Sequence, residues 1–128
     1  SLKNKLKGNI LVVEDNRSNA LYLRMMLQAR GLGVEVATSG ERALEVLEQQ
    51  AFHLIFMDLH MPGVGGVETL RRIRQIKGDE SQSSVPIVVL SADVSNDAQE
   101  KSKLVGANDF VSKPVAPETI DGLLVKYL

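Results

Sequence analysis

The segment LIFMDLHMP, residues 54–62, decides the fold that we expect for this chain. Apolar residues lead directly to one carboxylate, Asp58, and a proline turn follows at Pro62. A short apolar run that ends at a turn is typical of a strand buried inside a parallel sheet. Asp58 then lies at the carboxyl end of the strand, the edge where ligands bind in open α/β sheets. A carboxylate here can also merely end the strand or cap the next helix, so the rest of the chain must decide.

The composition is that of one ordinary globular domain. The 128 residues are 44% hydrophobic and 24% charged, and the net charge of -1 argues against direct binding of nucleic acid. No apolar run approaches the roughly 18 residues of a membrane span, so we expect no membrane contact by this domain. Cysteine is absent, which excludes disulfides and thiolate metal sites. Residues 1–6 are polar and lysine-rich, and we expect a linker or cloning remnant there, followed by a domain at residues 7–128.

Five short apolar segments have the β-branched composition that is typical of strands. Apolar residues between these segments recur at spacings of three and four, which predicts a helix after each strand. The second strand alternates polar and apolar residues and is expected to be the more exposed one. The predicted strands are residues 10–13, 34–37, 53–57, 85–90 and 108–111, and the predicted helices begin near residues 17, 41, 67, 96 and 117.

The helical region also carries three more detailed expectations. Residues 78–84 are polar and rich in turn-forming residues, so we expect a loop there. The fourth helix has a weak apolar face that includes Leu104. The solvated face of the third helix is expected to carry Arg71, Arg72 and Arg74.

The alternation of five strands with five helices predicts an α/β fold. Such alternation gives a parallel sheet with right-handed crossovers and helices on both faces, which is a doubly wound arrangement. For five strands in a chain this short, we expect the flavodoxin-like (βα)5 order 2-1-3-4-5.

Polar side chains follow the carboxyl ends of four predicted strands: Glu14 and Asp15, Asp58, Ser91, and Lys113. In a parallel sheet these ends lie on one edge, so the side chains converge although they are far apart in the sequence. Three ionised carboxylates repel one another and stay ionised only if a cation neutralises them. Oxygen ligands without His or Cys favour a hard ion, Mg²⁺ or Mn²⁺.

The same residues suit phosphoryl-transfer chemistry. A lysine and a hydroxyl beside the carboxylates would bind an anion with several oxygens, such as a phosphoryl group. Asp58 would be the nucleophile, because an aspartate can form a covalent phosphoryl intermediate. Positioning and charge neutralisation by a metal ion and Lys113 would assist the transfer. The plain alternatives are a solvated strand end at Glu14 and Asp15, helix capping by Ser91, and a surface lysine at Lys113.

Four motifs at this spacing resemble a known family. They are LVVEDN at residues 11–16, MDLHMP at 57–62, LSA at 90–92 and SKP at 112–114. From about residue 9 to residue 128, the chain resembles a response-regulator receiver domain of two-component and phosphorelay signalling. The resemblance implies a module that catalyses its own phosphorylation and dephosphorylation.

The resemblance also implies roles for single residues. Asp58 would be the phosphoacceptor, and Glu14 and Asp15 would be the acidic pair that holds Mg²⁺. The backbone carbonyl of His60 would complete the protein ligands of the metal.

A second set of implied roles concerns the switch. Ser91 would be the switch hydroxyl, and Lys113 would contact the phosphoryl group from a Lys-Pro bond that is usually cis in the family. Phe110 occupies the aromatic switch position, where many relatives have tyrosine. Gly65 and Gly66 follow Pro62 in place of the acidic residue and glycine that are common there.

The Glu-Asp-Asn sequence at residues 14–16 is most similar to the receivers of hybrid histidine kinases. This resemblance implies a histidine kinase or a histidine phosphotransfer protein as partner, and a monomer or weak dimer. It implies a cytoplasmic location, alone or as the cytoplasmic part of a membrane-bound sensor kinase. A stand-alone or effector-linked response regulator is the alternative.

Two other functional classes fit less well. A phosphatase of the haloacid-dehalogenase type needs a second aspartate two residues after the nucleophile, where this chain has His60. A flavin-binding electron carrier needs a phosphate loop after the first strand, where Glu14 and Asp15 would repel a phosphate.

Overall fold

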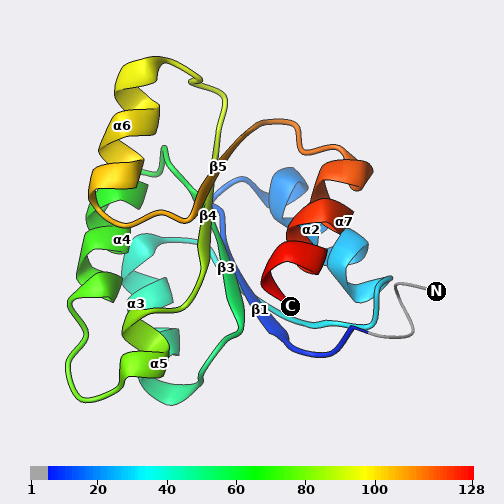
Figure 1. Ribbon diagram of the computed structural model, residues 1–128, viewed down its shortest axis with the longest axis horizontal. Helices are drawn as coiled ribbons and strands as arrows, with labels where there is room; N and C mark the ends of the chain where they lie inside the picture. Colours follow the sequence, from blue (N-terminus) through cyan, green and yellow to red (C-terminus); the bar gives the residue numbers. More distant parts are fainter. Residues whose placement is uncertain (1–5) are drawn as a thin grey trace.

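The computed structural model describes residues 6–128 and shows a five-stranded parallel sheet in the order β2-β1-β3-β4-β5 (Figure 1). The predicted fold class and strand order are confirmed. All four pairs of neighbouring strands are parallel, so their carboxyl ends lie on one edge. The strands are β1 (Asn9–Val13), β2 (Gly33–Ala37), β3 (Leu54–Asp58), β4 (Ile87–Ser91) and β5 (Asp109–Ser112).

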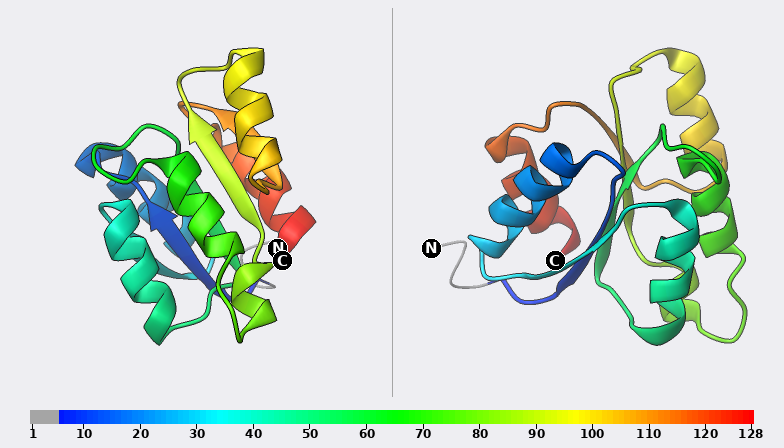
Figure 2. Two further views of the ribbon diagram at one scale, coloured as in Figure 1. Left: turned by 90° about the vertical axis from the view of Figure 1, so that its left-hand side faces the viewer. Right: turned by 180° about the vertical axis from the view of Figure 1, so that it is seen from behind.

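Helices cover both faces of the sheet (Figure 1, Figure 2). On one face lie α2 (Arg17–Gln28) and α7 (Pro117–Tyr127). On the other face lie α3 (Gly40–Gln49), α4 (Gly66–Arg74), α5 (Glu80–Ser83) and α6 (Asn96–Leu104).

The central strands β1, β3 and β4 carry apolar side chains on both faces because the sheet separates two cores. Leu11 and Ile55 point into the core beneath α3 and α4, whereas Val12 and Phe56 point into the core beneath α2 and α7. These four side chains are completely buried. The edge strand β2 alternates exposed and partly buried residues, as predicted. The sheet is therefore a rigid support for groups at its carboxyl edge.

Helix α4 begins very close to the end of β3. A Cβ atom at Gly66 would lie 2.3 Å from the carbonyl oxygen of Asp58 and 2.7 Å from the Cα of Leu59. Only glycine permits this approach, because any side chain would collide with the backbone. Gly66 therefore allows the first turn of α4 to lie directly against the strand end that carries Asp58.

Three of the helix predictions are wrong. The expected loop at residues 78–84 contains the short helix α5, which Asp79 caps by accepting a hydrogen bond from Ser81 N. Leu104 is 86% exposed rather than part of an apolar face. The buried positions of α6 are instead Ala98 and Ser102, which are four residues apart and face the sheet.

Arg74 also differs from its predicted place on a solvated face. Its guanidinium is half-buried and donates to the carbonyl oxygens of Ser83, Val85 and Gly106, and to the side-chain oxygen of Asn108. All five of its N–H donors are used, so Arg74 joins α4 to the start of β4 and to the loop before β5.

The expected linker at residues 1–6 lies mostly outside the described residues. Leu6, the first described residue, is partly buried against the core beneath α2 and α7. Within residues 6–128, none of the helices combines the length and the apolar character that crossing a membrane requires.

Candidate functional site

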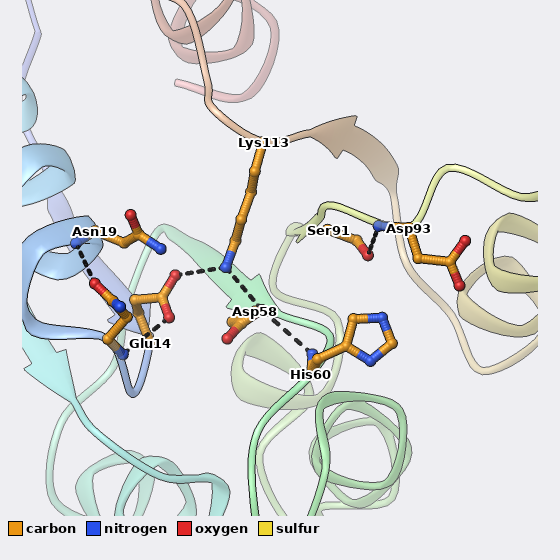
Figure 3. Close-up of polar contacts among 8 residues, drawn as sticks. Glu14, Asn19, Asp58, His60, Ser91, Asp93 and Lys113 are labelled. Atoms are coloured by element: carbon orange, nitrogen blue, oxygen red, sulfur yellow. Dashed lines mark hydrogen bonds and ion pairs between the residues drawn. The ribbon is translucent and has the colours of Figure 1, made fainter.

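The carboxyl edge of the sheet brings together side chains from four strands (Figure 3). Glu14 follows β1, Asp58 ends β3, Ser91 ends β4 and Lys113 follows β5. Parallel pairing of these strands aligns their ends, which is why residues up to 99 positions apart are in contact. The convergence expected from the sequence is therefore present in the structure.

Three carboxylates form a compact cluster at this edge. Glu14, Asp15 and Asp58 each offer an oxygen, and these oxygens lie within 4.8 Å of one another. Glu14 and Asp58 are 1% and 3% exposed, whereas Asp15 is open to solvent. An all-oxygen donor set with one open side fits a hard divalent cation such as Mg²⁺, which keeps several waters when it binds to protein.

Lys113 bridges the two buried carboxylates. Its ammonium donates to Glu14 Oε1 at 2.8 Å and to Asp58 Oδ1 at 2.9 Å (Figure 3). Burial alone would lower the pKa of Lys113, but these two hydrogen bonds outweigh burial and hold its pKa above the usual value. The ammonium is therefore charged at neutral pH and offsets part of the repulsion between the carboxylates.

Burial has the opposite effect on Glu14. It raises the pKa of the Glu14 carboxyl above its ordinary value, against the hydrogen bonds that Glu14 accepts from Lys113 and from Asn16 N. The neighbouring Asp58 raises this pKa further. A cation bound between the carboxylates would favour the ionised form of Glu14.

The loop after β3 contacts Asp58 through its backbone. The N–H of His60 donates to Asp58 Oδ1 at 3.2 Å, so the same oxygen accepts from His60 and from Lys113. The imidazole ring of His60 is exposed and lies on the same side of Asp58 as Asp93 (Figure 3).

Ser91 is completely buried at the end of β4. Its Oγ accepts a hydrogen bond from Asp93 N at 3.0 Å and is directed toward Asp93 rather than toward Asp58 (Figure 3). The Ser91 carbonyl accepts from Lys113 N at 2.9 Å, which joins the ends of β4 and β5. The Lys113–Pro114 bond is cis.

Phe110 lies away from the carboxylates, on β5. It is partly buried against the core beneath α3 and α4. It also lines a cavity of about 430 Å³ between α6 and β5, together with Ser102 and Asp109. The ring therefore has open space beside it.

Two contacts at the site were not predicted from the sequence. Asp93 N fixes the Ser91 hydroxyl, and the Tyr22 hydroxyl donates to the carbonyl oxygen of Val115 at 2.8 Å, just beyond Lys113. Asp93 and Ser95 form a short turn whose spacing could have been noticed. No sequence pattern indicates the contact of Tyr22, because its partner Val115 lies 93 residues away.

Comparisons with known proteins agree with this geometry. The family model of the response regulator receiver domain matches residues 10–124. Hybrid signal transduction histidine kinase L of Dictyostelium discoideum is 36% identical over 126 residues, which is 96% of this chain and 7% of that protein. The chain thus spans a small part of this curated relative.

Two solved structures are similar throughout. The receiver domain of sensor histidine kinase PA1611 from Pseudomonas aeruginosa PAO1, with a magnesium ion coordinated in its active site cleft, matches with a TM-score of 0.85 at 30% identity and covers 95% of this chain and 98% of that chain. The second is a co-crystal structure of the Saccharomyces cerevisiae histidine phosphotransfer signaling protein Ypd1 and the receiver domain of its downstream response regulator Ssk1. It matches with a TM-score of 0.86 at 32% identity and covers 94% of this chain and 88% of that chain. The chain belongs to the response regulator receiver domain family.

Proposed function

We propose that this receiver domain accepts a phosphoryl group on Asp58 from a phosphohistidine of a partner protein. The observation that carries the proposal is the cluster of Glu14, Asp15 and Asp58, whose oxygens lie within 4.8 Å, with the Lys113 ammonium on two of them. These three carboxylates and the backbone carbonyl of His60 would hold Mg²⁺. When bound, the ion supplies charge neutralisation for the carboxylate and for the phosphoryl oxygens.

The residues of the chain carry out the rest of the transfer. An oxygen of Asp58 forms the bond to phosphorus while the P–N bond to the donor imidazole breaks, and the imidazole nitrogen keeps that electron pair. The Lys113 ammonium lies 2.9 Å from Asp58 Oδ1, so it would be the nearest cationic side chain to a phosphoryl group bound to Asp58. Burial of Asp58 strengthens these electrostatic contacts, because the site is poorly screened by water.

The conformational switch would begin at Ser91. Its Oγ accepts from Asp93 N, which leaves the hydroxyl hydrogen free to be donated to a phosphoryl oxygen. Movement of Ser91 toward Asp58 would draw the loop before α6 with it. The Phe110 ring could then enter the space that this movement opens, which would change the surface formed by α6, β5 and α7.

The partner would be a histidine kinase or a histidine phosphotransfer protein. The similarity to the receiver domain that was crystallised with Ypd1, and to hybrid kinase L, supports this proposal. We place the domain in the cytoplasm, where the ATP that charges a histidine kinase is found, within a hybrid kinase rather than a stand-alone regulator.

The direct test uses acetyl phosphate and Mg²⁺ with intact-mass measurement. We expect the wild type to gain the mass of one phosphoryl group and to lose it in hydroxylamine. Asp58→Asn keeps the size of the side chain but removes the nucleophilic charge, and it should gain nothing. Equal labelling of Asp58→Asn would overturn the assignment, and omission of Mg²⁺ is the control for the metal.

A further inference from the structure

Two hydrogen bonds hold the backbone on either side of Lys113. Its own N–H donates to the Ser91 carbonyl at 2.9 Å and fixes the segment to β4. Two residues later, the Val115 carbonyl accepts from the Tyr22 hydroxyl at 2.8 Å and fixes the segment to α2. The position of the Lys113 backbone is therefore defined from both sides of the site.

Packing around Lys113 is incomplete on the side of α2. A cavity of about 320 Å³ lies there, and its lining includes Glu14, Tyr22, Lys113 and Val115. An aliphatic stem that borders a cavity is held less firmly than one in a close-packed core. Tyr22 and Val115 both line this cavity, and the hydrogen bond between them restrains the segment where packing does not.

We propose that Tyr22 is a positioning residue that sets where the Lys113 ammonium lies relative to Asp58. This inference rests on the proposed phosphoryl transfer to Asp58. The Lys113 ammonium must contact Glu14, Asp58 and an incoming phosphoryl oxygen, and its contacts of 2.8 and 2.9 Å weaken if the segment shifts. Tyr22 is 40% exposed, so its ring is not a core side chain and its contribution at this position comes from the hydroxyl contact.

The test distinguishes an effect on Mg²⁺ binding from an effect on binding of the phosphoryl oxygens. Tyr22→Phe removes the hydroxyl and keeps the ring. Its Kd for Mg²⁺ should change less than its Kd for beryllofluoride, because the three carboxylates keep their own positions and Lys113 contacts only two of them. Its Kd for beryllofluoride, which stands in for the phosphoryl group, should rise about threefold to tenfold, the value of one neutral hydrogen bond. The rate of phosphorylation by acetyl phosphate should fall by a similar factor.

The matched control is Tyr127→Phe. Tyr127 also donates its hydroxyl to a partner, the Asp109 carboxylate, but it lies on α7 away from the carboxylate cluster. Tyr127→Phe should have the same Kd for beryllofluoride and the same phosphorylation rate as the wild type.

A double-mutant cycle tests whether Tyr22 acts through Lys113. The effect of Tyr22→Phe on the phosphorylation rate is measured twice, once in the wild-type protein and once in the Lys113→Met variant. If the inference holds, Tyr22→Phe slows the wild type and has no further effect on Lys113→Met. Equal slowing in both backgrounds, or a Tyr22→Phe rate equal to that of the wild type, overturns the inference and leaves the proposed function standing. If the wild type is not phosphorylated, both the inference about Tyr22 and the proposed function are wrong.

Discussion

Asp15 differs from the other two carboxylates of the cluster in its exposure. Glu14 and Asp58 are buried and share the Lys113 ammonium, whereas Asp15 is exposed and accepts no hydrogen bond from that lysine. One cation thus faces two buried carboxylates while a third adds negative charge from solvent. Without a metal ion, Asp15 raises the energy of the folded state by repulsion.

Replacement of Asp15 should therefore stabilise the metal-free protein. We expect Asp15→Asn to raise the melting temperature in EDTA and to weaken Mg²⁺ binding, so that Mg²⁺ raises its melting temperature less than that of the wild type. Thermal denaturation with and without Mg²⁺ checks both effects. Glu48→Gln, which removes an exposed carboxylate on α3, is the control and should change neither quantity. An Asp15→Asn protein with unaltered stability and Mg²⁺ affinity would show that Asp15 is not part of the metal site.

Strand β4 connects the site to the face of α6. Its last residue, Ser91, is buried beside Asp58, and the next turn leads through Asp93 into α6. Phe110 on the neighbouring strand borders the cavity beneath α6. A shift of Ser91 can therefore reach α6 through a few residues of backbone.

Ser91→Ala should separate phosphorylation from the switch. Asp58 should still be phosphorylated, because the hydroxyl does not take part in bond formation, but amide chemical-shift changes on adding beryllofluoride should shrink across residues 96–110. Ser95→Ala loses a cap of α6 and serves as the control, since its response to beryllofluoride should remain. Full-sized shifts in Ser91→Ala would mean that the hydroxyl does not couple site to surface.

The opposite end of the sheet depends on Arg74. Its five donors serve neutral acceptors on two segments, residues 83–85 and 106–108, so removal leaves part-buried carbonyl oxygens without partners. We expect Arg74→Met to lower the free energy of unfolding by about 2–4 kcal/mol. The exposed Arg72→Met should lower it by less than about 1 kcal/mol, because an exposed ion pair contributes little. Urea denaturation compares them, and equal losses would show that the Arg74 contacts are not stabilising.

For the whole molecule, the sequence predicted what depends on periodicity and strand ends. The buried runs, the strand order and the meeting of Glu14, Asp58, Ser91 and Lys113 follow from local patterns and from the parallel sheet. The burial of Arg74 could not be predicted. The apolar periodicity of α4 assigns Arg74 to the polar face, but it carries no information about the carbonyl oxygens of distant segments that Arg74 contacts. The contact of Tyr22 with Val115 is equally hidden, since it depends on how α2 and the loop after β5 meet.

Chemical location of the adduct shows directly whether Asp58 carries the phosphoryl group. The wild type is phosphorylated with acetyl phosphate and Mg²⁺, reduced with borohydride, digested and analysed by mass spectrometry. Borohydride converts an aspartyl phosphate into homoserine, so the peptide that contains residues 54–62 should carry that change at position 58 alone. Reduction at Glu14 or Asp15, or a phosphoryl group on His60, would show that Asp58 is not the phosphoacceptor.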